Sequence, residues 1–221
     1  MIRKRKKVTT TADVTVITPT IPGREQDLAR CLQSVYWQTV PPAAHLVVAQ
    51  QKATDGPRPV AVAQGQNQAL STVRTTWVLR LADDDWLTPQ AIEKLLEAAD
   101  QADVVYGPDR DGVAGMTDVN GWDAERLTGF YPEHDVGPQS GDLYRTKALR
   151  SIGGWCTEWV NGHFHHPMVP VCLLPYEDSA TRCVLAYCGF RFRYISYPTW
   201  VMGQTTPDRI SNVPVPLTPC G

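Results

Sequence analysis

The stretch VTVITPTIPGREQDLARCLQSVYWQT, residues 14–39, joins a β-branched apolar run to an amphipathic segment through a short turn. Residues 14–18 carry no charge, which is typical of a strand that is buried on both faces of a sheet. After the turn, apolar side chains recur at helical spacing, at Leu28, Cys31, Leu32, Val35 and Tyr36. A strand, a turn and a helix in this order predict the first unit of an α/β fold.

The alternation of strands and helices continues through the first half of the chain. Apolar runs predict further strands at residues 45–49, 58–63, 77–82 and 102–107. Helices are predicted between them, at residues 67–74 and after Thr88-Pro89, which has the residue types of an N-cap and a first helical turn. Such alternation favours a Rossmann-like single domain with a mainly parallel central sheet flanked by helices.

The pattern weakens after residue 107, where glycine, aspartate and proline become frequent. We expect DLYRTKALRSIGGW (142–155) to begin as a strand and continue as a short helix, and residues 156–176 to be irregular. EDSATRCVLAYCG (177–189) predicts a helix that ends at Gly189, and the alternating FRFRYIS (190–196) predicts a last strand.

The composition is that of an ordinary globular domain, with 43% hydrophobic and 20% charged residues in a chain of 221. No stretch approaches the ~20 apolar residues that cross a bilayer. The net charge of −2 creates no field that would attract nucleic acid. RKRKK (3–7) is a local exception, and no apolar run follows it as in a secretory signal. We expect a solvated arm there, with a weak contact to nucleic acid or a membrane surface as the alternative.

The six cysteines show no CxxC spacing of a zinc or redox site. Cys31, Cys183 and Cys188 fall on apolar positions of predicted helices, where a thiol behaves as a small hydrophobe. We therefore expect a reducing, cytoplasmic compartment.

Three polar segments follow predicted strands: PTIPGRE (19–25), QQKATDG (50–56) and ADDDW (82–86). Ligands of open α/β sheets bind outside the carboxyl ends of the strands, so these segments mark the predicted site. A helix that begins near Glu25 would direct free N–H groups toward an anion there, and Arg24 would add a positive charge.

Asp83, Asp84 and Asp85 gather three negative charges at the end of an apolar run. Mg²⁺ and Mn²⁺ prefer carboxylate oxygens and keep positions for phosphate oxygens, so the triplet suits an ion that is held against a diphosphate. The alternative is a polar turn in which Asp85 or Thr88 caps the next helix. Because a turn gains little from three mutually repelling charges, we favour the bound cation.

Four segments resemble the family 2 glycosyltransferases, and they occur in the order of that family. Residues 14–39 are similar to its opening, which is usually a strand, P-T-x-N-R and a helix that ends S-V-x-x-Q-T. NQALSTVRTTWVLRLADDDWLTPQAIEKL (67–95) resembles the stretch that carries the DxD motif. GDLYRTKALRSIGGW (141–155) resembles the acceptor-side segment, and PYEDSATRCVLAYCGFRFRYIS (175–196) resembles the E-D helix and its following strand.

The resemblance implies a GT-A fold and a metal-dependent, inverting enzyme that moves a sugar from a nucleotide-diphosphate donor to an acceptor hydroxyl. A UDP-sugar is the favoured donor, held through Mn²⁺ or Mg²⁺. The acceptor is a glycan, a lipid, a protein or a modified base. The expected organisation is a basic arm at 1–12, a nucleotide-sugar-binding half at 13–107, an acceptor-binding and catalytic-base half at 108–202, and a tail at 203–221.

The resemblance also implies roles for single residues. Asp84 matches the metal-binding aspartate, Asp83 matches the neighbour that contacts the donor ribose, and Asp85 supports the metal site or caps a helix. Asp178 matches the general base, with Glu177 beside it. Further donor-binding positions are Pro19, Thr20, Arg24, Gln50, Asp55 and Asn67. The acceptor-binding positions are Gly141, Asp142, Gly154, Trp155 and His163.

The chain departs from the family pattern at several positions. Ala82 stands at the first position of the usual D-x-D frame, and Gln50-Gln51 replaces the usual acidic end of the second strand. A glutamine oxygen still accepts a hydrogen bond from a uracil N–H, but its amide also donates. Cys156 stands where an acidic residue is common, and WVMGQTT (200–206) lacks the late histidine that assists the metal in some members.

NGHFHHP (161–167) has no counterpart in the family. We expect its histidines, His163, His165 and His166, to line the acceptor site, with a solvated loop or a zinc site as alternatives. Trp155, Trp159 and Trp200 are candidates for stacking on the acceptor, and core packing is the alternative for each of them.

Three other functions compete with glycosyl transfer. A catalytically silent nucleotide- or sugar-binding module of the same fold is favoured by Ala82 and the glutamine pair. A nucleotidyltransferase would require more glycine and arginine after the first strand than PTIPGRE contains. A nucleic-acid-associated protein would depend on the basic segment 3–7.

Overall fold

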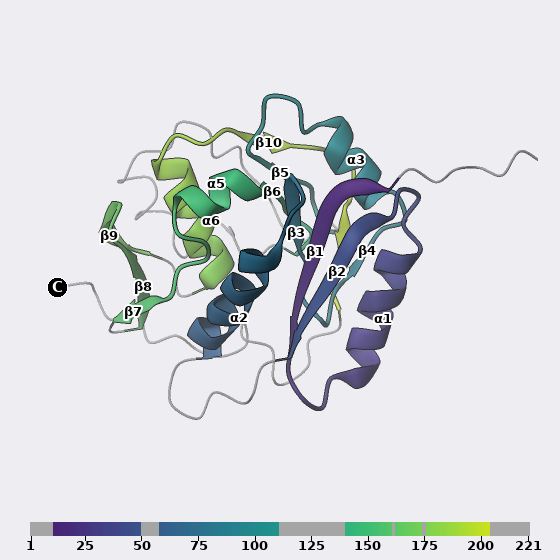
Figure 1. Ribbon diagram of the computed structural model, residues 1–221, viewed down its shortest axis with the longest axis horizontal. Coiled ribbons are helices and arrows are strands. Elements are labelled where there is room, and N and C mark those ends of the chain that lie inside the picture. Colours follow the sequence, from purple (N-terminus) through teal and green to yellow (C-terminus); the bar gives the residue numbers. More distant parts are fainter. Residues whose placement is uncertain (1–10, 50–57, 111–139, 161, 174–175, 204–221) are drawn as a thin grey trace, which may run out of the picture.

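A six-stranded sheet runs through the middle of the molecule and is flanked by helices (Figure 1). The computed structural model describes residues 11–49, 58–110, 140–160, 162–173 and 176–203. The strand order is β10-β5-β6-β3-β1-β2. These strands span Phe192–Tyr194 (β10), Val104–Tyr106 (β5), Leu143–Arg145 (β6), Trp77–Arg80 (β3), Ala12–Thr20 (β1) and Pro42–Ala49 (β2). Only β6 is antiparallel to its neighbours in this sheet, so the predicted mainly parallel α/β architecture is confirmed.

Alternate side chains of the central strands enter two apolar cores, one on each face of the sheet. Val16 of β1 and Leu79 of β3 lie in the core that is covered by α1 (Glu25–Tyr36) and α3 (Ala91–Glu97). Ile17 and Val78 lie in the opposite core. The helices on that side are α2 (Arg58–Thr72), α5 (Thr146–Ser151) and α6 (Glu177–Tyr187). Burial on both faces explains the β-branched apolar run that begins the chain's first strand.

Helix α2 takes the place of one predicted strand. Residues 58–63 form its first turns, so the strand prediction for this segment is wrong. Val62, Ala63 and Leu70 are buried at helical spacing. Pro59 lies in the first turn, where the missing N–H of proline removes no helical hydrogen bond. The helix predicted at residues 67–74 is the second half of the same element.

A two-stranded sheet of β4 (Trp86–Leu87) and β11 (Trp200–Val201) holds the chain that follows the three aspartates. Thr88 belongs to this contact, because its hydroxyl donates to the carbonyl of Pro198 at 2.7 Å. Helix α3 begins only at Ala91, with Gln90 at its N-cap position. The prediction that Thr88 caps this helix is therefore wrong.

Three short antiparallel strands, β7 (Glu158–Val160), β8 (His163–His166) and β9 (Val169–Leu173), form a separate sheet beside α6 (Figure 1). The expectation that residues 156–176 are irregular is thus wrong for these strands. Phe164 of β8 is fully buried and joins the core under α6. Among the helices of the described ranges, none is both long and apolar enough to span a membrane.

Candidate active site

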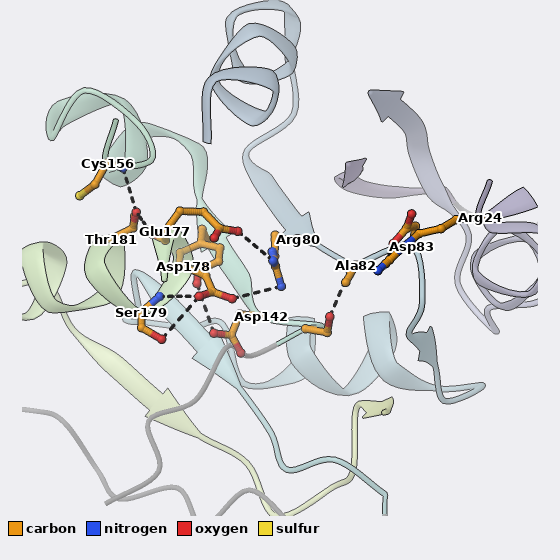
Figure 2. A network of polar contacts seen from close by, with 12 residues as sticks. Arg24, Arg80, Ala82, Asp83, Asp142, Cys156, Glu177, Asp178, Ser179 and Thr181 are labelled. Atoms are coloured by element: carbon orange, nitrogen blue, oxygen red, sulfur yellow. Dashed lines mark hydrogen bonds and ion pairs between the residues drawn. The ribbon is translucent and has the colours of Figure 1, made fainter. Parts of the chain in front are cut away.

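The carboxyl ends of β1 and β3 bring four side chains together, which we call the strand-end cluster: Thr20, Arg24, Asp83 and Asp84. The Thr20 hydroxyl donates to Asp83 Oδ2 at 2.8 Å. Arg24 Nη1 donates to Asp83 Oδ1 at 2.8 Å (Figure 2). The same nitrogen donates to Asp84 Oδ2 at 3.2 Å. The turn after β1 and the turn after β3 are thereby joined through one guanidinium nitrogen.

Burial and charge act against each other in the strand-end cluster. Burial raises the pKa of Asp83, while hydrogen bonds from Thr20 and Arg24 and the arginine's charge oppose that rise. Burial lowers the pKa of Arg24, but Asp83 and Asp84 outweigh it, so the net pKa of the guanidinium is raised. A cation at this point therefore compensates for the partial burial of the two carboxylates.

Asp85 lies apart from this ion pair. Its Oδ1 accepts a hydrogen bond from the backbone N–H of Gly203 at 3.0 Å. A Cβ atom at Gly203 would overlap the carbonyl oxygen of Asp84, so only glycine allows the approach. The three aspartates thus have different environments: Asp83 and Asp84 share Arg24, and Asp85 accepts from the Gly203 backbone.

The donor set of the strand-end cluster fits a magnesium or manganese ion. Asp83 Oδ1 and Asp84 Oδ2 both face one positively charged atom. Within the described ranges, no group of three or more His, Cys, Asp or Glu side chains converges as a metal site. An ion that takes one or two carboxylates from the protein and completes its shell with phosphate oxygens and water is the type that these residues suit.

A second group of charges, the buried cluster, lies on the other side of β3 and comprises Arg80, Asp142, Glu177, Asp178 and Arg182. Arg80, the last residue of β3, points toward the first two residues of α6 (Figure 2). Its Nη2 donates to Glu177 Oε1 at 2.9 Å, and its Nη1 lies 3.2 Å from Asp178 Oδ2. The backbone N–H of Ser179 donates to Asp178 Oδ1 at 2.7 Å. Asp178 is 0% exposed, so both of its oxygens face protein groups.

Burial dominates the electrostatics of the buried cluster. It raises the pKa of Glu177 to about 7, assisted by Asp178 and opposed by Arg80. It raises the pKa of Asp142 to about 7, opposed by Arg182, whose Nε lies 3.5 Å from Asp142 Oδ2. Burial lowers the pKa of Arg80, but Asp178 and Glu177 outweigh it, so the net pKa is raised. Two arginines thus face three acids, a set that becomes neutral when one acid binds a proton.

Comparison with known proteins gives one family match, over part of the chain, and several similar structures. Residues 54–152 match the model of Glycosyl transferase family 2. TarS of S. aureus, solved in complex with UDP-GlcNAc, has a similar structure, with a TM-score of 0.60 and 16% sequence identity. The chain has the GT-A fold of this glycosyltransferase, and the family match covers residues 54–152 of the 221.

A second similar structure is the mannosyltransferase PcManGT of Pyrobaculum calidifontis, solved in complex with GDP-Man and Mn²⁺, with a TM-score of 0.59 and 16% identity. The match to TarS covers 91% of this chain and 61% of that one, and the match to PcManGT covers 90% and 59%. The chain therefore spans about three fifths of the length of these solved glycosyltransferases. No curated protein sequence gives a significant match.

Several residues expected in the glycosyltransferase site make structural contacts. The Asn67 amide pairs with the backbone of Trp155, accepting from its N–H at 2.8 Å and donating to its carbonyl at 2.9 Å. Gly154 has φ +92, and a Cβ there would overlap the Asn67 amide. The Trp155 ring is buried against Tyr144. Gly141 has φ +80 and packs on Trp200.

The remaining predicted positions are spread over the domain. Pro19 lies in β1 and pairs in register with Val48 of β2. His163 lies in β8 opposite Val160. The neighbouring His166 Nε2 lies 2.8 Å from the Ile152 carbonyl, and its Nδ1 accepts from the Met168 N–H at 3.2 Å. Gln50 and Asp55 lie outside the described residues.

Sequence reasoning missed Arg80, Arg182, Ser140 and Gly203. Ser140 accepts the backbone N–H of Ala82 at 3.1 Å and so holds the turn before the aspartates. For Arg80 a local signal was present, because it is the only charge in the apolar run WVLRLA (77–82). A charge inside a strand that is buried on both faces requires a buried partner. For Arg182 and Gly203 the chain gives no comparable signal.

Proposed function

We propose that the chain transfers a sugar from a nucleotide-diphosphate donor to an acceptor hydroxyl, with inversion and with a divalent metal ion. The observation that carries this proposal is the meeting of Thr20, Arg24, Asp83 and Asp84 at the carboxyl ends of two parallel strands. In open α/β sheets this is where nucleotides bind.

The strand-end cluster is the donor side of the proposed site. Asp84, with Asp83 beside it, would hold Mn²⁺ or Mg²⁺, and the ion would supply positive charge that stabilises the departing diphosphate. Thr20 orients the Asp83 carboxylate through its hydrogen bond. The N-terminus of α1 follows Arg24 directly, so the positive end of the helix dipole lies next to the same point, although Glu25 and Asp27 in its first turn offset part of this charge. UDP-GlcNAc in TarS and GDP-Man in PcManGT support a nucleotide-sugar donor, and we favour a UDP-sugar.

The buried cluster is the acceptor side of the proposed site. Single inversion requires a base on the face of the sugar opposite to the leaving group, and we assign this role to Asp178. Arg80 lies against both Asp178 and Glu177 and so holds the start of α6 beside the end of β3. Gly141, Asp142, Gly154, Trp155 and His163 are the positions proposed to shape the acceptor region.

A catalytically silent binding module of the same fold is the alternative, and the burial of Asp178 favours it. A base that is 0% exposed and paired with Arg80 reaches an acceptor hydroxyl only after a rearrangement. In the silent module, Glu177 and Asp178 would only anchor α6 to β3.

A two-stage experiment tests the proposal. Thermal shift with UDP, GDP and their sugar conjugates, with and without Mn²⁺, identifies the donor because a ligand of the native state raises its melting temperature. Consumption of that donor is then measured with glycan, lipid, protein and modified-base acceptors. Metal-dependent transfer supports the enzyme, whereas donor binding without turnover supports the silent module. Absence of any nucleotide-dependent shift would refute both.

A further inference from the structure

The position of Arg24 raises a question about how the proposed metal enters. One of its nitrogens, Nη1, contacts Asp83 Oδ1 and Asp84 Oδ2 at once, at 2.8 and 3.2 Å. The arginine side chain is 11% exposed, and both carboxylates are 6% exposed. A positive atom that is shared by two adjacent carboxylates stands where a divalent ion bound to both of them would have to stand.

We propose that Arg24 is a resident counter-ion that a divalent ion displaces, and that the displaced guanidinium then binds the diphosphate of the donor. The inference rests on the proposed metal-dependent function and adds to it an exchange of cations. A guanidinium and a divalent ion repel one another and cannot share the same two oxygens, so binding of one excludes the other.

The neighbouring contacts leave these two oxygens as the point of exchange. Thr20 occupies the other oxygen of Asp83, which fixes the orientation of that carboxylate. The Gly203 backbone occupies Oδ1 of Asp85, which directs Asp85 elsewhere. Neither contact involves Asp83 Oδ1 or Asp84 Oδ2. The exchange therefore requires movement of the Arg24 side chain, while these two supporting hydrogen bonds persist.

The chain around Arg24 suits a side chain that changes partner. Arg24 occupies the N-cap position of α1 but makes no side-chain cap hydrogen bond, so the start of the helix does not depend on its present conformation. The preceding Pro22-Gly23 is exposed. Arginine has a long flexible stem, and its planar fork pairs with phosphate in two parallel hydrogen bonds. A diphosphate beside the N-terminus of α1 would lie within reach of the released guanidinium.

The exchange predicts that metal and nucleotide bind cooperatively. Metal alone must break the two contacts of Arg24 without any compensation. Metal with a diphosphate gives the released guanidinium a new anionic partner. Each ligand therefore increases the affinity for the other, as linkage requires.

The test is a Mn²⁺ titration followed by electron paramagnetic resonance, first with Mn²⁺ alone and then with UDP or GDP present. Arg24→Gln is expected to bind Mn²⁺ alone about tenfold more tightly than wild type, because no charge-assisted contacts need to be broken. The same variant is expected to bind the Mn²⁺–nucleotide complex about tenfold more weakly, because the diphosphate loses a charged donor. Arg24→Lys keeps the charge, so its affinity for Mn²⁺ alone should remain near wild type, whereas its affinity for the Mn²⁺–nucleotide complex should lie between those of wild type and Arg24→Gln, because an ammonium group lacks the planar fork.

Arg30→Gln is the matched control, since Arg30 is an exposed arginine of the same helix that stacks on Trp86. It should change neither titration. Changes of opposite sign in Arg24→Gln support the exchange. Mn²⁺ affinity that is unchanged or weaker overturns it, and unchanged nucleotide binding overturns the transfer of Arg24 to the diphosphate.

The same titrations separate this inference from the proposed function. If no variant binds Mn²⁺ while transfer proceeds in EDTA, the exchange of cations is wrong and glycosyl transfer stands. If Arg24→Gln shows the expected changes but the wild type turns over no donor, the exchange is supported and the enzyme is refuted.

Discussion

Two arginines of this molecule each hold a pair of adjacent acidic residues, but they do so in different surroundings. Arg24 joins Asp83 and Asp84 through one nitrogen at the edge of the sheet. Arg80 contacts Glu177 and Asp178 through two separate nitrogens beneath α6. The two arginine side chains are similarly exposed, at 11% and 9%, whereas the carboxylates are 6% exposed around Arg24 and 3% and 1% exposed around Arg80.

The difference indicates what each pair is suited to. A pair that shares one nitrogen, on an arginine that follows an exposed turn, is the more exchangeable of the two, because another cation has only that nitrogen to replace. A buried pair has no solvent to replace a lost partner, so it fixes the position of the elements that carry it. We therefore expect the strand-end cluster to respond to ligands and the buried cluster to hold α6 against β3.

Removal of the arginines gives the largest expected difference in stability between the two clusters. Arg80→Met leaves two carboxylates unpaired in the core and should lower the free energy of unfolding by about 3–5 kcal/mol. Arg24→Met should cost about 1 kcal/mol, and Mn²⁺ should restore part of that loss by replacing the missing cation. Urea unfolding with and without Mn²⁺ measures both. Equal losses in the two variants would remove the distinction between the clusters.

Substitution of one acid in each pair separates donor binding from catalysis. Asp84→Asn and Asp178→Asn should each lower the rate of sugar transfer by about 10²–10³-fold. Asp84→Asn should also abolish the increase in donor affinity that Mn²⁺ gives to the wild type. Asp178→Asn should keep that increase, because Asp178 lies in the buried cluster and not at the proposed metal site. Calorimetric titration of the donor, beside a transfer assay, measures both properties. Loss of donor binding in Asp178→Asn would contradict the division into a donor side and an acceptor side.

Asn67 ties the two halves of the domain together between these clusters. It lies on α2 and holds both backbone groups of Trp155, which follows the Gly153-Gly154 turn. Asn67→Ala leaves these groups unpaired and should cost about 1–3 kcal/mol in urea unfolding. Asn67→Asp keeps the acceptor and loses the donor, so its loss should be intermediate. A direct role in donor binding would instead lower nucleotide affinity without loss of stability.

The same two regions differ in how well the sequence predicts them. Residues 14–18 and 77–80 are apolar runs whose burial on both faces is a local property, so their strands were predictable. The aspartates at 83–85 follow such a run directly, and their place at a strand end needed no other part of the chain. The family match, which begins at residue 54 and ends at 152, includes the aspartates but not the first strand.

The second half depends on contacts between distant segments, which a local pattern does not contain. Strands β7, β8 and β9 are three to five residues long and are stabilised by pairing with one another. Arg80 and Glu177 are 97 positions apart, so the local sequence indicates that Arg80 needs a buried partner but not which residue provides it. The strand prediction for residues 58–63 is wrong for another reason. Val-Ala-Val-Ala has strand-like composition, but the residues that follow continue it into a 15-residue helix.

The smallest expected effect concerns the charge balance of the buried cluster. Burial raises the pKa of Glu177 to about 7, above its ordinary value of 4.5, so the native state binds a proton that the unfolded chain releases. The contribution of Glu177 to the free energy of unfolding is fully present below the pKa of the unfolded chain. It is lost as the pH rises through the pKa of the native state. The wild type should therefore lose stability between about pH 4.5 and pH 7, and Glu177→Gln should lose less. Near pH 5 the two proteins should melt alike, because glutamine resembles the protonated acid, and by pH 8 the melting temperature of the variant should be about 2–4 °C above that of the wild type.

Glu97→Gln, on the exposed end of α3, controls for the loss of a carboxylate. If the variant falls further below the wild type as the pH rises, Glu177 acts mainly as the ionised partner of Arg80, and Arg80 needs the negative charges of both Glu177 and Asp178.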